Sequence, residues 1–215
     1  MGIVRESLIL MIFVAVVAIT ISDAVPFDTY YQPLWGPDHF TVTGQGKEVQ
    51  LLIDSSSGGS GFKSKQEYCS GIFRMQIKIS YKLTGGVITS FYLISGGEAI
   101  GNHDEIDFEF LGTNGTLQTN VFVNDEGHRE ELIKLWFDPS QDFHTYELNW
   151  NAKQILFKVD EMTVRTFNYP GSYIPRPLHV EATIWNVSWA GTVDWSKAPF
   201  TSYYRGFYID GTPCK

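Results

Sequence analysis

Acidic and apolar side chains alternate along the segment His103–Leu111, which is the pattern of a β-strand with one buried face. Glu105, Asp107 and Glu109 would line one face of this strand. The opposite face would enter the core with Ile106, Phe108 and Phe110. Like charges in such a row repel one another and lower stability, so a row of three carboxylates points to a function.

Glycoside hydrolysis with retention uses two carboxyl groups about 5–5.5 Å apart, one as nucleophile and one as acid/base. The Cα atoms of Glu105 and Glu109 would be about 13 Å apart in an extended strand, and their side chains can lean toward each other. Asp107 between them would separate their pKa values. Two other interpretations stay open, namely a solvated charged face and a cation site, although calcium loops are irregular rather than extended.

The rest of the chain must supply a sheet that holds this strand. Segments with a strand pattern recur along the sequence: Phe73–Ile79, Val87–Ile94, Glu105–Leu111, Leu117–Val123, Leu132–Phe137, Phe143–Asn151, Ile155–Asp160, Met162–Phe167, Leu178–Trp185 and Phe200–Ile209. Asp160-Glu161 is expected to turn a tight hairpin, and Ser55–Gly61 is expected to be a flexible loop. Many short strands with turn residues between them predict an antiparallel β-sandwich or barrel.

Composition limits the classes of partner. The 215 residues carry a formal net charge of -8, which makes nucleic acid an unfavourable partner. Aromatic residues make up 15% of the chain, a surplus that suits a sugar-binding groove but also suits an all-β core.

The N-terminus has the order of a secretory leader. Arg5 precedes an apolar run over Leu8–Ile21, and small residues follow up to Ala24. The run is shorter than the ~20 residues that span a membrane. We therefore expect residues 1–24 to be a signal peptide, residues 25–215 to be one secreted domain, and no stable membrane association.

Secretion gives meaning to two further features. Asn114 and Asn186 begin Asn-X-Ser/Thr acceptor patterns for N-linked glycans. The two cysteines, Cys69 and Cys214, are able to form a disulfide in an oxidising compartment, but the sequence leaves their pairing open.

The stretch HDEIDFEFLG at 103–112 resembles the signature of glycoside hydrolase family 16, and closely that of its plant branch, the xyloglucan endotransglucosylase/hydrolases. The similarity extends over Ser60–Lys65, Phe91–Leu93, Gln118–Phe122, Leu135–Pro139, His144–Tyr146, Ile184–Asn186 and Asp194–Phe200. It implies a concanavalin-like β-jelly-roll sandwich of two antiparallel sheets with a concave groove. It also implies that Glu105 is the nucleophile, Glu109 the general acid/base and Asp107 the helper between them.

The resemblance further implies a monomer of the plant cell wall that needs no metal or organic cofactor. Its partners would be xyloglucan or a related β-glucan and an oligosaccharide acceptor. The implied sugar contacts are Gln118, Thr119, Asn120, His128, Arg129, Glu130, Trp185, Ser188, Trp189 and Gly191. Other interpretations stay open for some of these residues: an exposed polar strand face for Gln118 and Asn120, and core packing for the tryptophans.

The sequence departs from the plant branch in two regions that concern the acceptor. The resemblance ends near Cys214, before the usual C-terminal extension, and the tryptophan loop Trp185–Gly191 is shorter and lacks two aspartates. These departures make an endo-β-1,4-glucanase that only hydrolyses the first alternative. A lectin-like protein that binds sugar without catalysis is an alternative of another class, against which the three carboxylates argue. His103 is expected either to bond a sugar or to cap the strand.

Overall fold

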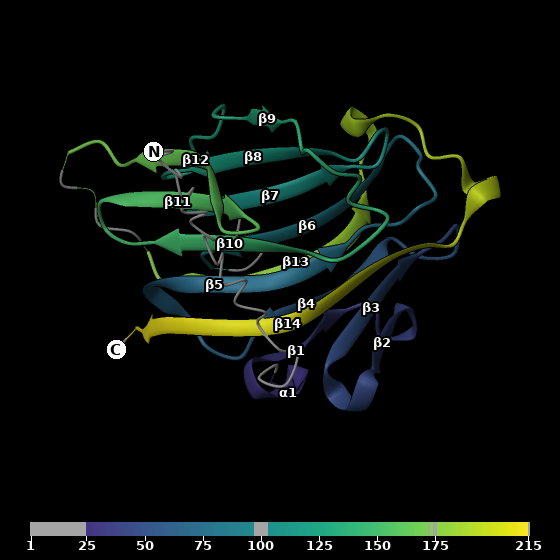
Figure 1. Ribbon diagram of the computed structural model, residues 1–215, viewed down its shortest axis with the longest axis horizontal. Coiled ribbons are helices and arrows are strands. Elements are labelled where there is room, and N and C mark those ends of the chain that lie inside the picture. The colour runs from purple at the N-terminus through teal and green to yellow at the C-terminus, as the bar shows by residue number, and fades with distance from the viewer. Residues whose placement is uncertain (1–24, 97–102, 172, 174–175, 215) are drawn as a thin grey trace, which may run out of the picture.

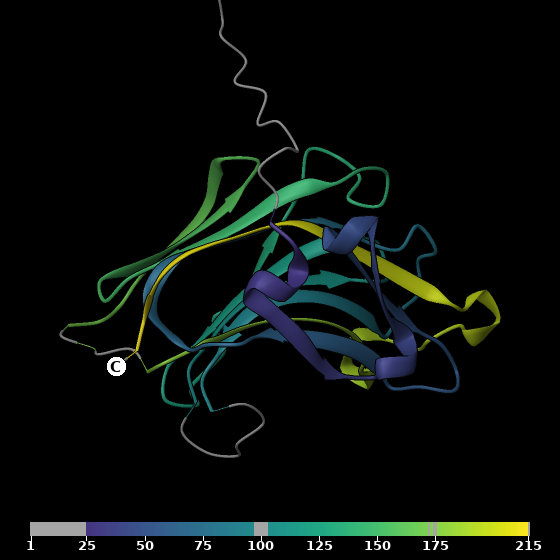
Figure 2. The same ribbon diagram turned by 90° about the horizontal axis from the view of Figure 1, so that it is seen from below.

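The computed structural model describes residues 25–96, 103–171, 173 and 176–214. The expected signal peptide, residues 1–24, lies outside the described residues. Two seven-stranded antiparallel sheets pack face to face (Figures 1 and 2). Sheet A has the strand order β1 (Tyr31–Trp35), β4 (Gly59–Ser64), β13 (His179–Asn186), β6 (Val87–Ile94), β7 (Glu105–Leu111), β8 (Thr116–Phe122) and β9 (Glu131–Ile133).

Sheet B covers the inner face of sheet A. Its strand order is β12 (Met162–Asn168), β11 (Gln154–Val159), β10 (His144–Trp150), β5 (Tyr68–Lys78), β14 (Phe200–Pro213), β3 (Glu48–Ile53) and β2 (Phe40–Thr43). The described helices are short: α1 (Phe27–Tyr30), η2 (Pro37–His39), η3 (Gly44–Gly46), η4 (Ser188–Ala190) and η5 (Trp195–Lys197). The prediction of a jelly-roll sandwich of two antiparallel sheets is confirmed.

The core between the sheets holds β7 in place. Phe108 and Phe110 are at most 1% exposed. Phe108 packs edge-on against Phe157 of sheet B at a ring distance of 5.3 Å, and Phe110 packs edge-on against Tyr146 at 4.9 Å. Because successive side chains alternate along a strand, these inward anchors force the residues between them to the opposite face.

Four strands near the N-terminus were not predicted, and the expectation of a flexible loop over Ser55–Gly61 is partly wrong. Strand β4 begins at Gly59, between β1 and β13. Gly59 has φ +114°, and a Cβ atom there would lie 1.9 Å from the carbonyl oxygen of Ile184. This glycine therefore permits close approach of two strands, a tertiary requirement that looks like flexibility in the sequence.

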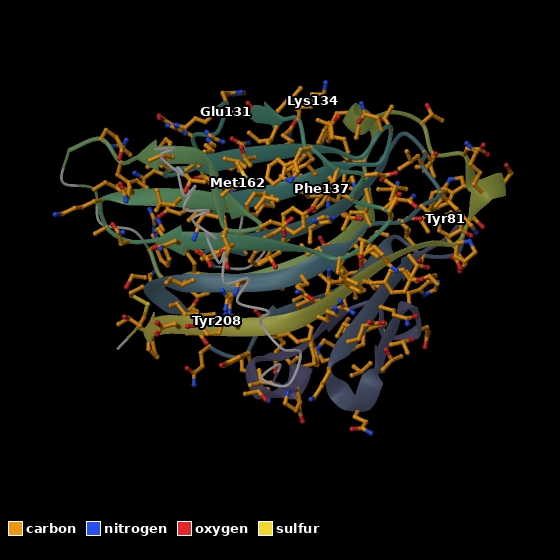
Figure 3. All side chains as sticks on the ribbon, viewed as in Figure 1. Tyr81, Glu131, Lys134, Phe137, Met162 and Tyr208 are labelled. Carbon is orange, nitrogen blue, oxygen red and sulfur yellow. A yellow bond between two sulfur atoms is a disulfide. The ribbon has the colours of Figure 1, made fainter. Side chains whose placement is uncertain are left out.

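The other predicted strands are confirmed, with ends that differ by up to five residues, except for one. The segment predicted as Leu132–Phe137 is a strand only over Glu131–Ile133, at the edge of sheet A. Beyond Ile133 the chain leaves the sheet toward the partly buried Phe137, and Lys134 lies at the outer rim (Figure 3). The alternating pattern of Leu132–Phe137 therefore reflects alternating burial of its side chains, and the part beyond Ile133 has no strand partner.

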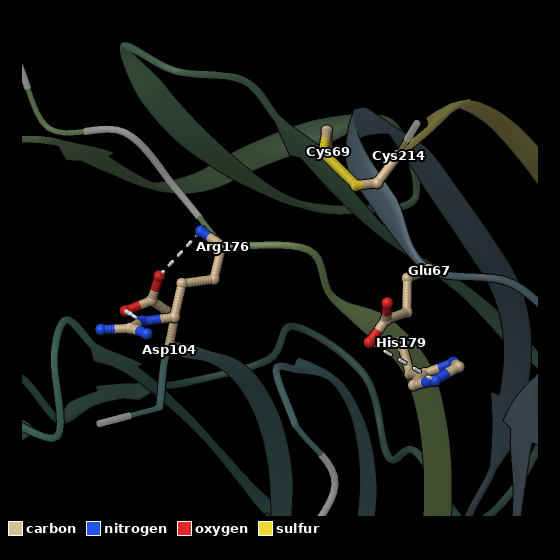
Figure 4. The surroundings of a disulfide bond; sticks show 6 residues. All are labelled: Glu67, Cys69, Asp104, Arg176, His179 and Cys214. Atoms are coloured by element: carbon tan, nitrogen blue, oxygen red, sulfur yellow. Dashed lines mark hydrogen bonds and ion pairs between the residues drawn. A yellow bond between two sulfur atoms is a disulfide. The ribbon is translucent and has the colours of Figure 1, made fainter. Parts of the chain in front are cut away.

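Two local expectations are settled by the structure. Asp160 and Glu161 both have positive φ, 46° and 69°, and they form the tight turn between β11 and β12 as predicted. Cys69 of β5 and Cys214, the residue after β14, form a disulfide with Cα atoms 5.3 Å apart (Figure 4). The pairing that the sequence left open is thus made between neighbouring strands.

Candidate active site

The three carboxylates of β7 lie together on the face of sheet A that points away from the core. Asp107 is 4% exposed, and Glu105 and Glu109 are half-buried. They line a cavity of about 440 Å³ whose other residues come from β1, β6, β13 and the loop before β4: Trp35, Gly58, Ser90, Tyr92, Thr183, Trp185 and Asn186. The predicted one-face carboxylate row is confirmed, and it lies in a cavity rather than on a fully solvated surface.

Glu109 has the pKa of a group able to donate a proton near neutrality. Burial, as the largest cause, and the charges of Glu105 and Glu130 together raise the pKa of its carboxyl to about 7. A hydrogen bond from Gln118 Nε2 to Glu109 Oε2, 3.1 Å long, acts in the opposite direction because it favours the ionised carboxylate. Gln118 and Glu109 are directly opposite each other in the β7–β8 pairing.

Asp107 is the most buried of the three carboxyls. Desolvation raises its pKa well above the ordinary value, and the neighbouring charges of Glu105 and Glu109 add to this effect. This shift favours the protonated form of Asp107, which forms a hydrogen bond with Glu105.

Burial also raises the pKa of Glu105, but its hydrogen bonds to Asp107 and His103 and the charge of His103 oppose the shift. The same strand thus carries a carboxyl that keeps its proton to about pH 7, Glu109, and a carboxyl whose ionised form has two stabilising partners, Glu105. Separated protonation states of this kind are what an acid and a nucleophile in one site require.

The predicted contacts on β8 divide by strand parity. Gln118 and Asn120 point to the face of sheet A that carries the cavity. They pair across the β7–β8 ladder with Glu109 and Asp107, respectively. Asn120 is 5% exposed, and its amide nitrogen donates to Glu130 Oε1 at 3.2 Å. The expectation of a sugar contact by the Thr119 side chain is wrong, because this side chain points into the core, is fully buried and accepts a hydrogen bond from Arg165 Nη1 at 2.8 Å.

The stretch His128–Glu130 supports β8 rather than lining the cavity. The Arg129 guanidinium donates to the backbone carbonyls of Val121 and Gly127 at 3.2 and 3.1 Å, and also to that of Glu126. The Glu130 carboxylate accepts from Asn120, and His128 is exposed with a φ of 61°. These contacts hold the turn after β8 in shape.

The tryptophan loop contributes unevenly to the cavity. Trp185 lines it next to Thr183, as their shared strand face predicts. Ser188, Trp189 and Gly191 lie outside its lining, and Trp189 is 57% exposed on η4. The cavity does not bring these three residues to the carboxylates.

The two glycan acceptors occupy different surroundings. Asn114 is exposed in the turn between β7 and β8, where its Oδ1 accepts a hydrogen bond from the amide of Thr116 at 3.0 Å. Asn186, at the end of β13, is exposed but lines the cavity.

Sequence reasoning missed several lining residues. Ser90 and Tyr92 share a strand face by period 2, so the pattern of Val87–Ile94 contained the signal that finds them. The Tyr92 hydroxyl donates to Glu181 Oε2 at 2.8 Å. Trp35 lies on a strand that the sequence did not reveal, so only the tertiary structure brings it to the cavity.

Within the described ranges, no group of three or more His, Cys, Asp or Glu side chains is arranged to hold a metal ion. No helix in the same part of the chain has the length and apolar character to cross a membrane.

Comparisons with known proteins agree with this geometry. Residues 27–213 match glycosyl hydrolases family 16. Xyloglucan endotransglucosylase/hydrolase protein 3 of Arabidopsis thaliana is 48% identical over 199 residues, which cover 87% of this chain and 67% of the relative. Protein 2 of the same name and organism is 44% identical over 206 residues, covering 87% and 68%. The chain thus spans about two thirds of the length of these relatives.

The fold has solved counterparts. A prokaryotic β-1,3-1,4-glucanase (lichenase) derived from a mouse hindgut metagenome superposes with a TM-score of 0.73 at 24% identity, over 89% of this chain and 98% of that one. This likeness concerns the fold alone. The match over residues 27–213 and the identity to the two plant relatives show that the chain belongs to glycosyl hydrolases family 16.

Proposed function

We propose that this protein is a xyloglucan endotransglucosylase/hydrolase that cleaves the β-1,4-glucan backbone of xyloglucan with retention. The observation that carries the proposal is the carboxylate row of β7 in its cavity. The pKa of Glu109 is raised to about 7, and Glu105 forms hydrogen bonds with its neighbours. The names of the plant relatives support xyloglucan as the substrate.

In the first step the Glu109 carboxyl donates its proton to the glycosidic oxygen. Glu105 attacks the anomeric carbon at the same time, so the bond to the leaving chain breaks and a glycosyl ester of Glu105 forms. Asp107 forms a hydrogen bond with Glu105, and because burial favours its protonated form it limits the negative charge of the row while the nucleophile is ionised. The leaving chain departs as an alcohol.

In the second step the Glu109 carboxylate removes a proton from an incoming hydroxyl group. The oxygen of that hydroxyl attacks the anomeric carbon and releases Glu105, which gives overall retention. A sugar 4-hydroxyl as the acceptor produces a transferred chain, and water produces hydrolysis. Trp35 and Trp185 line the cavity and supply aromatic surface for packing against sugar.

The proposal includes a cellular setting. Residues 1–24 act as a signal peptide and residues 25–215 work in the plant cell wall as a monomer without a metal or organic cofactor. The Cys69–Cys214 disulfide suits an oxidising compartment, and the names of the plant relatives support a role on a wall polysaccharide.

The test uses the secreted protein with xyloglucan, in the presence and absence of a fluorescently labelled xyloglucan oligosaccharide. Movement of the label into long polymer identifies a transglucosylase, and falling viscosity with new reducing ends but no label transfer identifies the hydrolase. Glu105→Ala must abolish both activities while near-ultraviolet circular dichroism stays unchanged. A folded wild-type protein that binds xyloglucan but changes neither readout would refute the enzyme and leave the lectin-like alternative.

A further inference from the structure

His103 lies between two carboxylates just before the catalytic strand. Its Nε2 is 3.2 Å from Glu105 Oε2, and its Nδ1 bonds Asp125 Oδ1 on the other side. The side chains of Asp125, His103 and Glu105 therefore form a chain of contacts from the turn after β8 to the carboxylate row. An imidazole can donate to two flanking carboxylates only when both ring nitrogens carry protons.

Asp125 is fixed in a tight turn after β8. Asn124 and Asp125 have φ of 51° and 67°, and the flanking Val123 and Glu126 form a β-bridge. The amide of Asp125 donates to the carbonyl of His103 at 2.8 Å, and the amide of His103 donates back to Asp125 Oδ1 at 2.9 Å. The carboxylate therefore reaches His103 through both backbone and side chain.

Asp104, the residue after His103, also binds the turn after β8. Asp104 is 3% exposed, and its Oδ1 accepts a hydrogen bond from the amide of Asn124 at 2.9 Å. Its Oδ2 accepts from the amide of Arg176 at 3.1 Å (Figure 4). His103 and Asp104 thus clamp the turn to the start of β7.

Packing restricts the imidazole further. The His103 ring stacks on Phe122 with centroids 5.3 Å apart and planes 29° apart. Phe122 is itself covered by Gly127, where an added Cβ would lie 2.5 Å from the ring. A ring held by stacking and by bonds at both nitrogens has little rotational freedom, which is what a positioning group needs.

We propose that His103, held by Asp125, is a positioning residue that orients Glu105 Oε2 for attack and keeps this carboxylate ionised. The inference rests on the proposed role of Glu105 as nucleophile. It assigns a purpose to the histidine that precedes the carboxylate row, which strand patterning alone left open between a sugar contact and a cap.

The electrostatic surroundings agree with this role. Glu105 faces Asp107 on its own strand and Tyr92 on β6, while Asp125 faces Arg176. Hydrogen bonds from His103 lower the pKa of Asp125, and the contact with His103 counteracts the rise that burial imposes on the pKa of Glu105. Loss of the imidazole would therefore raise the pKa of Glu105.

The experiment follows the first chemical step in His103→Gln with a xyloglucan-oligosaccharide aryl glycoside whose leaving group is dinitrophenolate. Such a leaving group needs no proton from Glu109, so phenolate release reports attack by Glu105. We expect release to slow by about 10–100-fold with KM within about twofold, as for loss of a charge-assisted hydrogen bond. The acid limb of kcat/KM should move up by about one pH unit.

His144→Gln is the matched control, because His144 pairs with Asp160 at 2.6 Å on sheet B, outside the cavity. It should leave the rate and the pH profile unchanged. Asp125→Asn is the second variant, for the case in which His103→Gln does not fold. It keeps an oxygen that accepts from the His103 amide and removes the charge, so a smaller shift in the same direction is expected.

Unchanged release and an unmoved acid limb in a folded His103→Gln or Asp125→Asn variant would overturn the inference. The variant Glu105→Ala separates failure of this inference from failure of the proposed function. If Glu105→Ala is inactive while His103→Gln is normal, only the positioning role falls. If Glu105→Ala keeps its activity, the nucleophile assignment falls, and the positioning role falls with it.

Discussion

Replacing Gln118 with methionine tests whether Glu109 is the general acid. Gln118 Nε2 donates to Glu109 Oε2 at 3.1 Å, and this bond lowers the pKa of Glu109 against the effect of burial. Methionine has nearly the same length as glutamine but no donor. Gln118→Met should therefore raise the pKa of Glu109 above its value of about 7.

The size of the shift follows from the worth of one hydrogen bond to a charged group. Such a bond contributes about 1.5–3 kcal/mol, and partial exposure of the pair reduces the effect toward the lower value. Since 1.36 kcal/mol corresponds to one pKa unit, the pKa of Glu109 should rise by about one unit. Glu109 must be protonated to act as an acid, so the alkaline limb of kcat/KM should move to higher pH by the same amount.

The assay is kcat/KM for xyloglucan cleavage measured across this limb in the wild type and in Gln118→Met. A lost contact between Gln118 and sugar would lower kcat/KM equally at every pH, so it would not displace the limb. Gln76→Met is the control, because Gln76 lies on sheet B and its Oε1 accepts from Arg205 Nε at 2.9 Å. An alkaline limb that stays in place or moves to lower pH would refute the reasoning.

The remaining predictions concern stability and modification. The Glu109 pKa is raised from 4.5 to about 7, so the folded protein binds this proton more tightly and loses roughly 3 kcal/mol of stability as pH rises through that window. Glu109→Gln should therefore gain melting temperature relative to the wild type between these pH values, and parallel curves would contradict this. Glycopeptide mass spectrometry of the active protein should find a glycan on the exposed Asn114 and none on Asn186, because a glycan on Asn186 would occupy the cavity that this residue lines. Cys214→Ser should lower the free energy of unfolding by about 2–4 kcal/mol in urea titrations, because the disulfide closes a sequence separation of 145 residues, and an unchanged midpoint would count against this.

Most of the central strands and the carboxylate row could be predicted from the sequence, because both depend on local alternation of side chains. Phe108 and Phe110 have to face the core, and a period of two then places Glu109 on the opposite face whatever the rest of the fold does. The same parity excluded Thr119 from the cavity face. It was expected to contact sugar only because the resemblance covers the whole stretch, and the structure shows that strand parity decides its position.

Other features depend on contacts between distant segments, which no local pattern records. Gly59 belongs to a strand because β13 approaches it closely, and Trp35 reaches the cavity because β4 then pairs with β1. His103 finds Asp125 only through the turn after β8. The acidic residues of β7 were evident from the sequence, but the pKa of about 7 at Glu109 was not. Burial and neighbouring charge set that value, and both arise only when the two sheets have folded around the strand.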